Sequence, residues 1–342
     1  MRVLEPSRES IDRIRGLPAR DLMRASIDRK EHVPTVIANG DIQLKSVLIA
    51  TDFSQASDKA LRHALAIARH YGAKLYLVHV VSSLGFTMVG PDAVRLATEI
   101  VVRDAGDLEN RLVQSGALAG LPHEIMVCQG NVWDQLDRII KQEQIELVVV
   151  GTHARTGMGK LLLGSVAEHI FRHLDCLVLT VGPGSLQDSP VGSTRAIGPF
   201  VFATDFSENS LHALPYAISS ANHFGTKLVL LHVMSDATAP DNLLLPTADD
   251  VMQFQEKARQ SSIARLEQLA VQHSKLSVTP EFVVEFGAPA EKILEVAHRF
   301  KSDAIILGLH HKASIGAASR MPWATAYQVV CSACCSVLTV RD

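Results

Sequence analysis

The apolar positions of the chain switch repeatedly between continuous runs and helical stripes. Residues 47–50 read VLIA, a run typical of a strand that is buried on both faces. An apolar stripe with i, i+3 and i+4 spacing follows, formed by Ala60, Leu61, Ala64, Leu65 and Ala68. This stripe predicts a helix, and Gly72 is placed to end it.

The same alternation predicts the remaining elements of the first half. Further strands are expected at residues 74–80, 124–128, 147–150 and 176–181. Further helices are expected at residues 93–115, 132–142 and 165–174. Because strands that alternate with helices pair in parallel through right-handed crossovers, this order predicts a doubly wound α/β domain, with a five-stranded parallel sheet flanked by helices.

The chain contains this pattern twice. Residues 50–80 and 203–233 align without a gap at an offset of 153, and 17 of the 31 positions are identical. Both segments begin ATDFS, and they end LVHV and LLHV. A second block aligns at an offset of 157, and the halves end in the similar runs LVLTV and SVLTV. A unit of about 140 residues is too long for a solenoid repeat, so the sequence predicts two tandem copies of one domain.

We expect four segments along the chain. Residues 1–43 precede both copies, and their mixed charge and three prolines suggest a flexible arm with a short helix near residues 10–15. The first copy is expected at residues 44–183 and the second at residues 199–342. Residues 184–198 between them are rich in Gly, Ser and Pro, as in a linker.

Composition narrows the class of protein. Lys and Arg number 33 against 36 Asp and Glu, for a net charge of −3, which disfavours a protein held to nucleic acid by bulk charge. No apolar run approaches about 18 residues, so we expect no membrane span, and the N-terminal segment lacks the apolar stretch of a secretory signal. Five cysteines, an odd and sparse number, favour a reducing cytoplasm over a disulfide scaffold.

Candidate chemistry lies where strands end, because ligands of doubly wound sheets bind beyond the carboxyl ends of the strands. Thr51 and Asp52 follow the first strand, and the run GTHARTGMGKLLLGS, residues 151–165, follows the fourth. The unpaired N–H groups at the start of the next helix form an anion site suited to phosphate. Gly164 would allow close approach and Ser165 would donate its hydroxyl, while Arg155 and Lys160 would balance the phosphate charge.

Each of these features has a structural alternative. Ser165 and Glu168 have the spacing of a helix capping box. Asp52 is equally suited to capping the helix that follows it. Gly151 and Gly164 fit simple turns, since glycine loops alone are weak indicators of phosphate binding.

Taken together, ATDFS, LVHV and the loop before the last helix resemble the universal stress protein family over both copies. ATP-binding members have the pattern Gly, two residues, Gly, nine residues, Gly, then Ser or Thr. Here these positions are Gly151, Ala154, Gly164 and Ser165, so alanine replaces the middle glycine and disfavours a positive φ there. The resemblance implies that Asp52 lies near the ribose and adenine, and the backbone around Val80 at the adenine edge. It also implies that the ribose and phosphates contact Gly151, His153, Arg155, Gly164, Ser165 and Val166.

The second copy departs further from this pattern. At an offset of 157, Gly308 matches Gly151, but Met321 and Pro322 replace Gly164 and Ser165. Proline suits the first turn of a helix, so the last helix is expected to remain, but proline has no N–H for a phosphate. Asp205 is retained. We interpret the second copy as a degenerate site that serves as partner of the first.

Other clusters support structural roles better than chemical ones. The run CSACC, residues 331–335, and the pair His310 and His311 lack the spacing of a zinc site, and we interpret the cysteines as buried and structural. His79 and His232 recur on the second strand of each copy and are expected to pack or to donate a hydrogen bond. Trp133 and Trp323 are interpreted as packing anchors.

Three functional hypotheses remain open at this stage. The first is a stress-response module that binds ATP, with or without Mg²⁺, in the first copy and changes what its surface offers to an unidentified protein partner. The second is a slow ATP hydrolase or phosphotransferase that uses Asp52 with a metal, although no catalytic motif is present and we favour a protein that is not an enzyme. The third is an interaction module independent of ATP. The family's last strand commonly lies at a dimer seam, so we expect a homodimer or a pseudo-dimer formed by the LVLTV and SVLTV strands of one chain.

Overall fold

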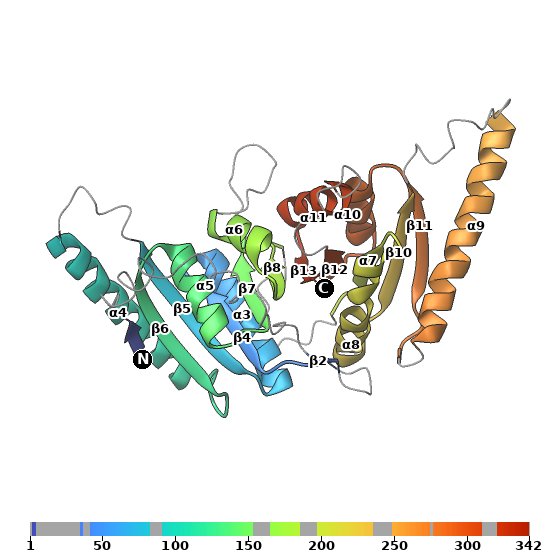
Figure 1. The fold of residues 1–342 in the computed structure, drawn as a ribbon. Helices are drawn as coiled ribbons and strands as arrows, with labels where there is room; N and C mark the ends of the chain where they lie inside the picture. The colour runs from blue at the N-terminus through green and yellow to red at the C-terminus, as the bar shows by residue number, and fades with distance from the viewer. Residues whose placement is uncertain are drawn as a thin grey trace, which may run out of the picture. The chain divides into compact units, whose positions relative to one another are not determined.

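The predicted alternation of strands and helices is present in the computed structural model (Figure 1). The structure describes residues 2–4, 35–36, 42–82, 91–152, 165–184, 197–234, 248–273, 276–309 and 320–341. It divides into two units. Unit 1 lies within residues 1–34, 44–150 and 165–176, and unit 2 comprises the rest of the chain.

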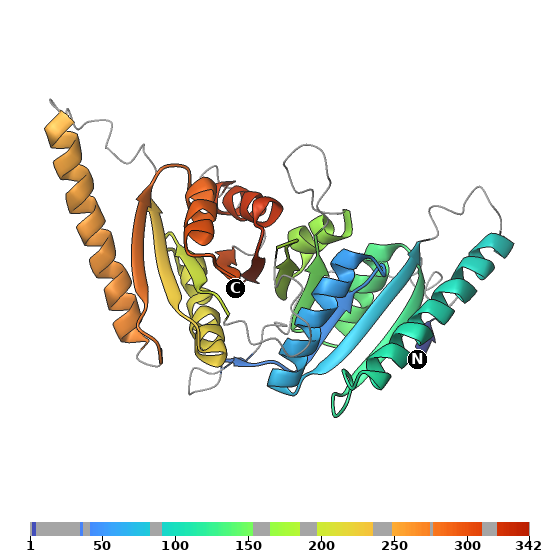
Figure 2. The same ribbon diagram turned by 180° about the vertical axis from the view of Figure 1, so that it is seen from behind.

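Unit 1 is built on a parallel sheet. Its strands, in spatial order, are β1 (Arg2–Leu4), β6 (His123–Gly130), β5 (Lys74–Ser82), β4 (Ser46–Ala50) and β7 (Leu147–Gly151). Every neighbouring pair is parallel. Helices α3 (Gln55–Tyr71) and α4 (Pro91–Gln114) cover one face, and α5 (Val132–Gln142) and α6 (Ser165–His173) cover the other (Figure 1, Figure 2). This arrangement confirms the predicted doubly wound α/β fold.

The strand β1 differs from expectation. We placed residues 1–43 outside both copies, but Arg2–Leu4 pair with Met126–Cys128 and extend the edge of the sheet. A three-residue strand held by pairing with a distant segment leaves little trace in a hydrophobic pattern. The helix expected near residues 10–15 lies outside the described residues. Two further short strands of the arm, β2 (Thr35–Val36) and β3 (Ile42–Gln43), pair with each other antiparallel.

Helix α3 shows why the local sequence folds as it does. Its predicted stripe is buried: Ala60, Leu61, Ala64, Leu65 and Ala68. The side chain of Ser54 caps the first turn by accepting from the Ser57 N–H. At the other end Gly72 adopts a φ of 63°, the left-handed conformation that glycine reaches without steric cost.

Unit 2 repeats the sheet and adds one strand. Its order is β8 (Leu177–Val181), β13 (Ser336–Arg341), β12 (Ala304–Leu309), β9 (Phe200–Thr204), β10 (Leu228–Met234) and β11 (Glu281–Phe286). All neighbours are parallel except β8 and β13, which pair antiparallel with Leu179 opposite Leu338. The expected pairing of the LVLTV and SVLTV strands is thus confirmed.

The helices of unit 2 follow the order of the first copy with one break. They are α7 (Glu208–His212), α8 (Leu214–Phe224), α9 (Ala248–Gln272), α10 (Pro289–Arg299) and α11 (Arg320–Ser332). The segment equivalent to α3 is divided into α7 and α8. Pro215 stands at the start of α8, and because proline lacks an N–H it cannot continue the helical ladder from α7.

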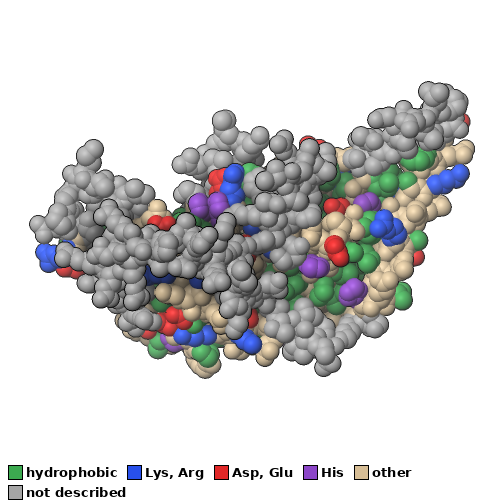
Figure 3. Space-filling model, viewed as in Figure 1, with side chains coloured by type: hydrophobic (Ala, Val, Ile, Leu, Met, Phe, Trp, Pro, Cys, Tyr) green, Lys and Arg blue, Asp and Glu red, His purple; other side chains and the backbone are tan. Residues whose placement is uncertain are grey.

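No helix among the described residues is long and apolar enough to cross a bilayer. On the face drawn in Figure 3, basic and acidic side chains of the described residues are interspersed. This distribution agrees with the near-neutral formal charge of −3.

Candidate functional site

The candidate site begins at the turn after β4. The buried Thr51 hydroxyl donates to Ser57 Oγ at 3.1 Å and accepts from the Phe53 N–H at 3.0 Å. The Asp52 carboxylate is exposed and accepts from the Ser54 N–H at 3.0 Å. Thr51 therefore holds the turn together. The alternative that Asp52 caps α3 is wrong in detail, because Ser54 is the N-cap residue and Asp52 accepts from the N–H of Ser54 instead.

Phe53 adopts an unusual backbone conformation at the centre of this turn. Its φ is 58°, in the left-handed region that bulky residues rarely occupy. The ring stacks on that of His79 with centroids 4.7 Å apart. A strained residue at a strand end is a frequent feature of functional sites, and the sequence signalled it only through the recurrence of phenylalanine in both ATDFS segments.

His79 fixes the turn from the neighbouring strand. Its Nδ1 lies 2.8 Å from the carbonyl oxygen of Thr51, and because a carbonyl only accepts, Nδ1 carries the proton. Burial lowers the pKa of His79, so the neutral ring is favoured. The expectation that this histidine donates a hydrogen bond is confirmed.

The second copy reproduces the turn closely. Phe206 has a φ of 63°, its ring lies 4.5 Å from that of His232 in a tilted arrangement, and His232 Nδ1 lies 2.8 Å from the Thr204 carbonyl oxygen. Asp205 accepts from both the N–H and the hydroxyl of Ser207. Burial tends to raise the pKa of Asp205, but these hydrogen bonds outweigh it and the pKa is lowered.

The register of the strands places the backbone of Val80 at the site. The ladder between β4 and β5 ends with Ala50 opposite Val78, followed by a bond from the Thr51 N–H to the Val78 carbonyl. The N–H and C=O of alternate residues point to the same side of a strand. Those of Val80 therefore point to the side of β4, beyond the last ladder bond. β5 itself continues to Ser82, two residues further than the pattern predicted.

The remaining predicted residues belong to β7, to α6 and to the segment of the chain between them. Gly151 is the last residue of β7, and α6 begins at Ser165, with Val166 half-buried next to it. Because α6 follows a parallel strand, its N-terminus lies at the carboxyl edge of the sheet. Glu168, the acidic member of the alternative capping box, forms an ion pair with Arg172 at 2.7 Å. His153, Arg155 and Gly164 lie outside the described residues, and so does the side chain of Ser165.

In the second copy the glycine after the fourth strand has a packing role. A Cβ atom at Gly308 would lie 2.1 Å from the carbonyl oxygen of Asn209 in α7, so only glycine lets the two backbones approach. The helix α11 is present with Pro322 in its first turn, as expected. His310 and His311 lie outside the described residues.

The prediction that the cysteines of residues 331–335 are buried is wrong, because Cys331 and Cys335 are half-buried and Cys334 is exposed. Burial raises the pKa of the Cys335 thiol to about 12, which suits an inert structural cysteine. Cys334 is the exposed member of the three. Its position at the turn between α11 and β13 places it on the surface. No cluster of three metal-ligating side chains exists within the described ranges.

Trp133 packs at the junction of α5 and α6. Its ring lies 4.3 Å from that of His169, which stacks on His173 at 4.1 Å. These contacts confirm its interpretation as a packing anchor. The side chain of Trp323 lies outside the described residues.

Comparison with known proteins gives a consistent result. The model of the family described as "Universal stress protein family" matches residues 43–182 and 197–341. A universal stress protein of Methanocaldococcus jannaschii is 27% identical over 148 residues, which cover 43% of this chain and 87% of that protein. A universal stress protein of Thermus aquaticus is 28% identical over 138 residues, which cover 40% of this chain and 98% of that protein. The solved structure of a universal stress protein from Archaeoglobus fulgidus superposes on 86% of this chain and 98% of its own chain, with a TM-score of 0.58. The sequence identity is 17%, so this match shows a similar fold.

Proposed function

The chain belongs to the universal stress protein family, and from that premise we propose that its first copy binds an adenine nucleotide, ATP with or without Mg²⁺. The observation that carries this proposal is the backbone of Val80. Its N–H and C=O point past the end of the β4 ladder, at the edge where doubly wound sheets bind ligands. A donor and an acceptor on one residue match the donor–acceptor edge of adenine.

The turn after β4 suits the ribose side of such a ligand. Asp52 is exposed and accepts from the Ser54 N–H, and the two oxygens of a carboxylate offer about four lone-pair sites, which suits it to accept from ribose hydroxyls as well. Thr51 is buried and engaged within the turn, so its contribution would be to hold Asp52 in place.

The phosphates would lie at the N-terminus of α6, where unpaired N–H groups and the helix dipole favour negative charge. Gly151, Gly164, Ser165 and Val166 would supply backbone contacts, and His153 and Arg155 side-chain contacts. Mg²⁺ would be bound largely by the nucleotide's own phosphates, with water completing its shell. In the second copy Pro322 removes one N–H from the equivalent position, so we propose one nucleotide per chain.

A binding role fits this site better than rapid catalysis. Phosphoryl transfer needs a placed nucleophile and metal-binding carboxylates, and Asp52 is the one carboxylate of the first ATDFS turn. We therefore propose a stress-response module whose nucleotide occupancy changes the loop of residues 151–164 and thereby the surface offered to a protein partner. A cytoplasmic location is part of this proposal and is supported by five free cysteines.

The deciding experiment measures the nucleotide content of the full chain after denaturation and chromatography. The expected result is about one adenine nucleotide per chain, because a tightly bound nucleotide stays with the protein during purification. A matching thermal shift is expected when ATP and Mg²⁺ are added to the stripped protein. Absence of both the bound nucleotide and the shift would contradict the proposal and favour an interaction module independent of ATP.

A further inference from the structure

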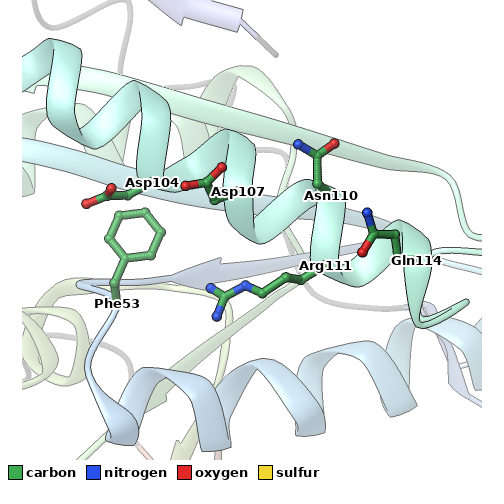
Figure 4. Close-up of a pocket in the computed structure, with 6 residues that line it drawn as sticks. All are labelled: Phe53, Asp104, Asp107, Asn110, Arg111 and Gln114. Atoms are coloured by element: carbon green, nitrogen blue, oxygen red, sulfur yellow. The ribbon is translucent and has the colours of Figure 1, made fainter.

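A shallow groove of about 680 Å³ lies between the Phe53 turn and α4 in unit 1 (Figure 4). One wall is the ring of Phe53. The other wall is a single face of α4, formed by Asp104, Asp107, Asn110, Arg111 and Gln114. Spacings of three and four residues place these side chains in a row along the helix.

The Phe53 end of the groove is acidic. Figure 4 shows the carboxylates of Asp104 and Asp107 beside the Phe53 ring, and Arg111, one turn beyond Asp107 on α4, extends its side chain toward the same end of the groove. Asp104 forms an ion pair with Arg103 at 3.6 Å, but the Arg103 side chain is largely exposed and that of Asp104 about half exposed, and such pairs contribute little. The carboxylates therefore keep most of their capacity to attract another cation.

In the second copy, the ring equivalent to Phe53 is that of Phe206, and it lies against a cationic side chain. Arg265, from the long helix α9, lies with its guanidinium carbon 4.0 Å from the Phe206 ring centroid. Helix α9 occupies the same place in chain order as α4, between the second and third strands of its copy. Among the described residues no Lys or Arg lies over the Phe53 ring. In the first copy α4 lines the groove with Asp104 and Asp107 next to the ring and with Arg111 beyond them.

We propose that this groove binds an alkylguanidinium group, which takes the position on Phe53 that Arg265 takes on Phe206. The face of an aromatic ring attracts a cation, and a guanidinium can stack on that face while its N–H groups pair with carboxylates. The inference does not depend on nucleotide binding, because it rests on Phe53, Asp104 and Asp107.

The test uses the full chain without nucleotide, at low salt, with ¹³C-labelled phenylalanine rings observed by NMR. Titration with N-acetylarginine amide is expected to shift the Phe53 ring signals in a saturable way. The neutral isostere N-acetylcitrulline amide is expected to have no such effect. Equal shifts from both compounds, or none from either, would overturn the proposal, whatever the outcome of the nucleotide experiments.

Variants on α4 locate the site. Asp104→Asn combined with Asp107→Asn is expected to weaken binding about fivefold, since exposed ion pairs are individually weak. Asp104→Arg supplies a guanidinium from the chain itself and is expected to abolish the response. Glu109→Gln removes one negative charge from α4 outside the groove, half the charge change of the double variant, and it is expected to bind normally. If Glu109→Gln weakens binding as much as the double variant, the effect is bulk charge and the site assignment is wrong.

Two sources of the guanidinium are distinguished by a second titration. Agmatine represents a free guanidino compound, and a short peptide with one central arginine represents the side chain of a protein. Tighter binding by agmatine supports a small-molecule ligand, and tighter binding by the peptide supports a protein partner. Failure of both to shift the Phe53 signals overturns the proposal.

Discussion

The Nδ1–H of His79 donates to the carbonyl oxygen of Thr51 across 2.8 Å, and this bond joins β5 to the turn on which the proposed nucleotide site depends. Burial lowers the pKa of His79 below its ordinary 6.5. The folded state therefore binds the proton less readily than the unfolded state. Stability linked to His79 is complete above pH 6.5 and is lost as the pH falls below that value.

We predict that the free energy of unfolding, measured with urea, is lower at about pH 5.5 than at about pH 7.5, roughly one unit either side of 6.5. His79→Asn keeps an N–H donor for the Thr51 carbonyl but does not titrate in this range, so the difference between the two pH values should shrink. His232→Asn is the matched variant of the second copy, where burial likewise lowers the pKa. An unchanged pH dependence in both variants would contradict the assignment.

The sequence specified some elements almost to the residue. Helix α5 spans Val132–Gln142 as predicted, because Asn131 caps its first turn and Leu136, Ile139 and Ile140 form a regular buried stripe. The resemblance to the universal stress protein family, carried by the ATDFS segments and the loop before the last helix, is also confirmed.

Features that depend on distant contacts were not predictable from local pattern. The predicted strand stopped at Val80, although Val81 continues the apolar run. The end of β5 at Ser82 is defined by pairing with β6, which the local pattern does not show. The strand β1 exists because β6 offers a free edge. Gly308 was matched to a ligand-binding glycine, whereas its contact with Asn209 requires knowledge of how α7 packs.

Asp52 has two proposed roles that a pair of substitutions separates. Asp52→Asn keeps an oxygen to accept from the Ser54 N–H, so stability should change by less than about 0.5 kcal/mol. Asp52→Ala removes that acceptor and should cost about 1 kcal/mol, the usual net value of one hydrogen bond, in urea unfolding. Both variants should weaken ATP binding measured by calorimetry, since an amide does not replace a carboxylate towards the ribose.

Asp205→Asn is the control, because the second copy is expected to bind no nucleotide. Normal ATP affinity in Asp52→Asn would leave Asp52 with only its role in the turn, as acceptor for the Ser54 N–H. Multiple turnovers of ATP by the unmodified protein that are lost in Asp52→Asn would instead establish a hydrolase.

Two glycine substitutions should shift stability in opposite directions. Gly308→Ala places a Cβ 2.1 Å from the Asn209 carbonyl oxygen, and the backbone must move, at a cost of about 2–3 kcal/mol. Gly106→Ala lies within α4, where a Cβ meets nothing within 4 Å, so the higher helix propensity of alanine should stabilise by up to about 1 kcal/mol. Urea unfolding of each variant measures both effects. A Gly308→Ala protein of unchanged stability would show that the backbones of α7 and β12 are not in close contact at Asn209 and Gly308.

The loop that begins at Gly151 offers the most direct test of the phosphate site. Gly164→Met introduces the residue that the second copy has at the equivalent position, and the added side chain should block phosphate approach and abolish ATP binding in calorimetry. Ala154→Gly restores the glycine that ATP-binding relatives carry and should strengthen binding, because glycine adopts a positive φ without strain. Circular dichroism should show both variants folded. If Gly164→Met binds ATP as tightly as the unmodified chain, the phosphates do not lie at the N-terminus of α6.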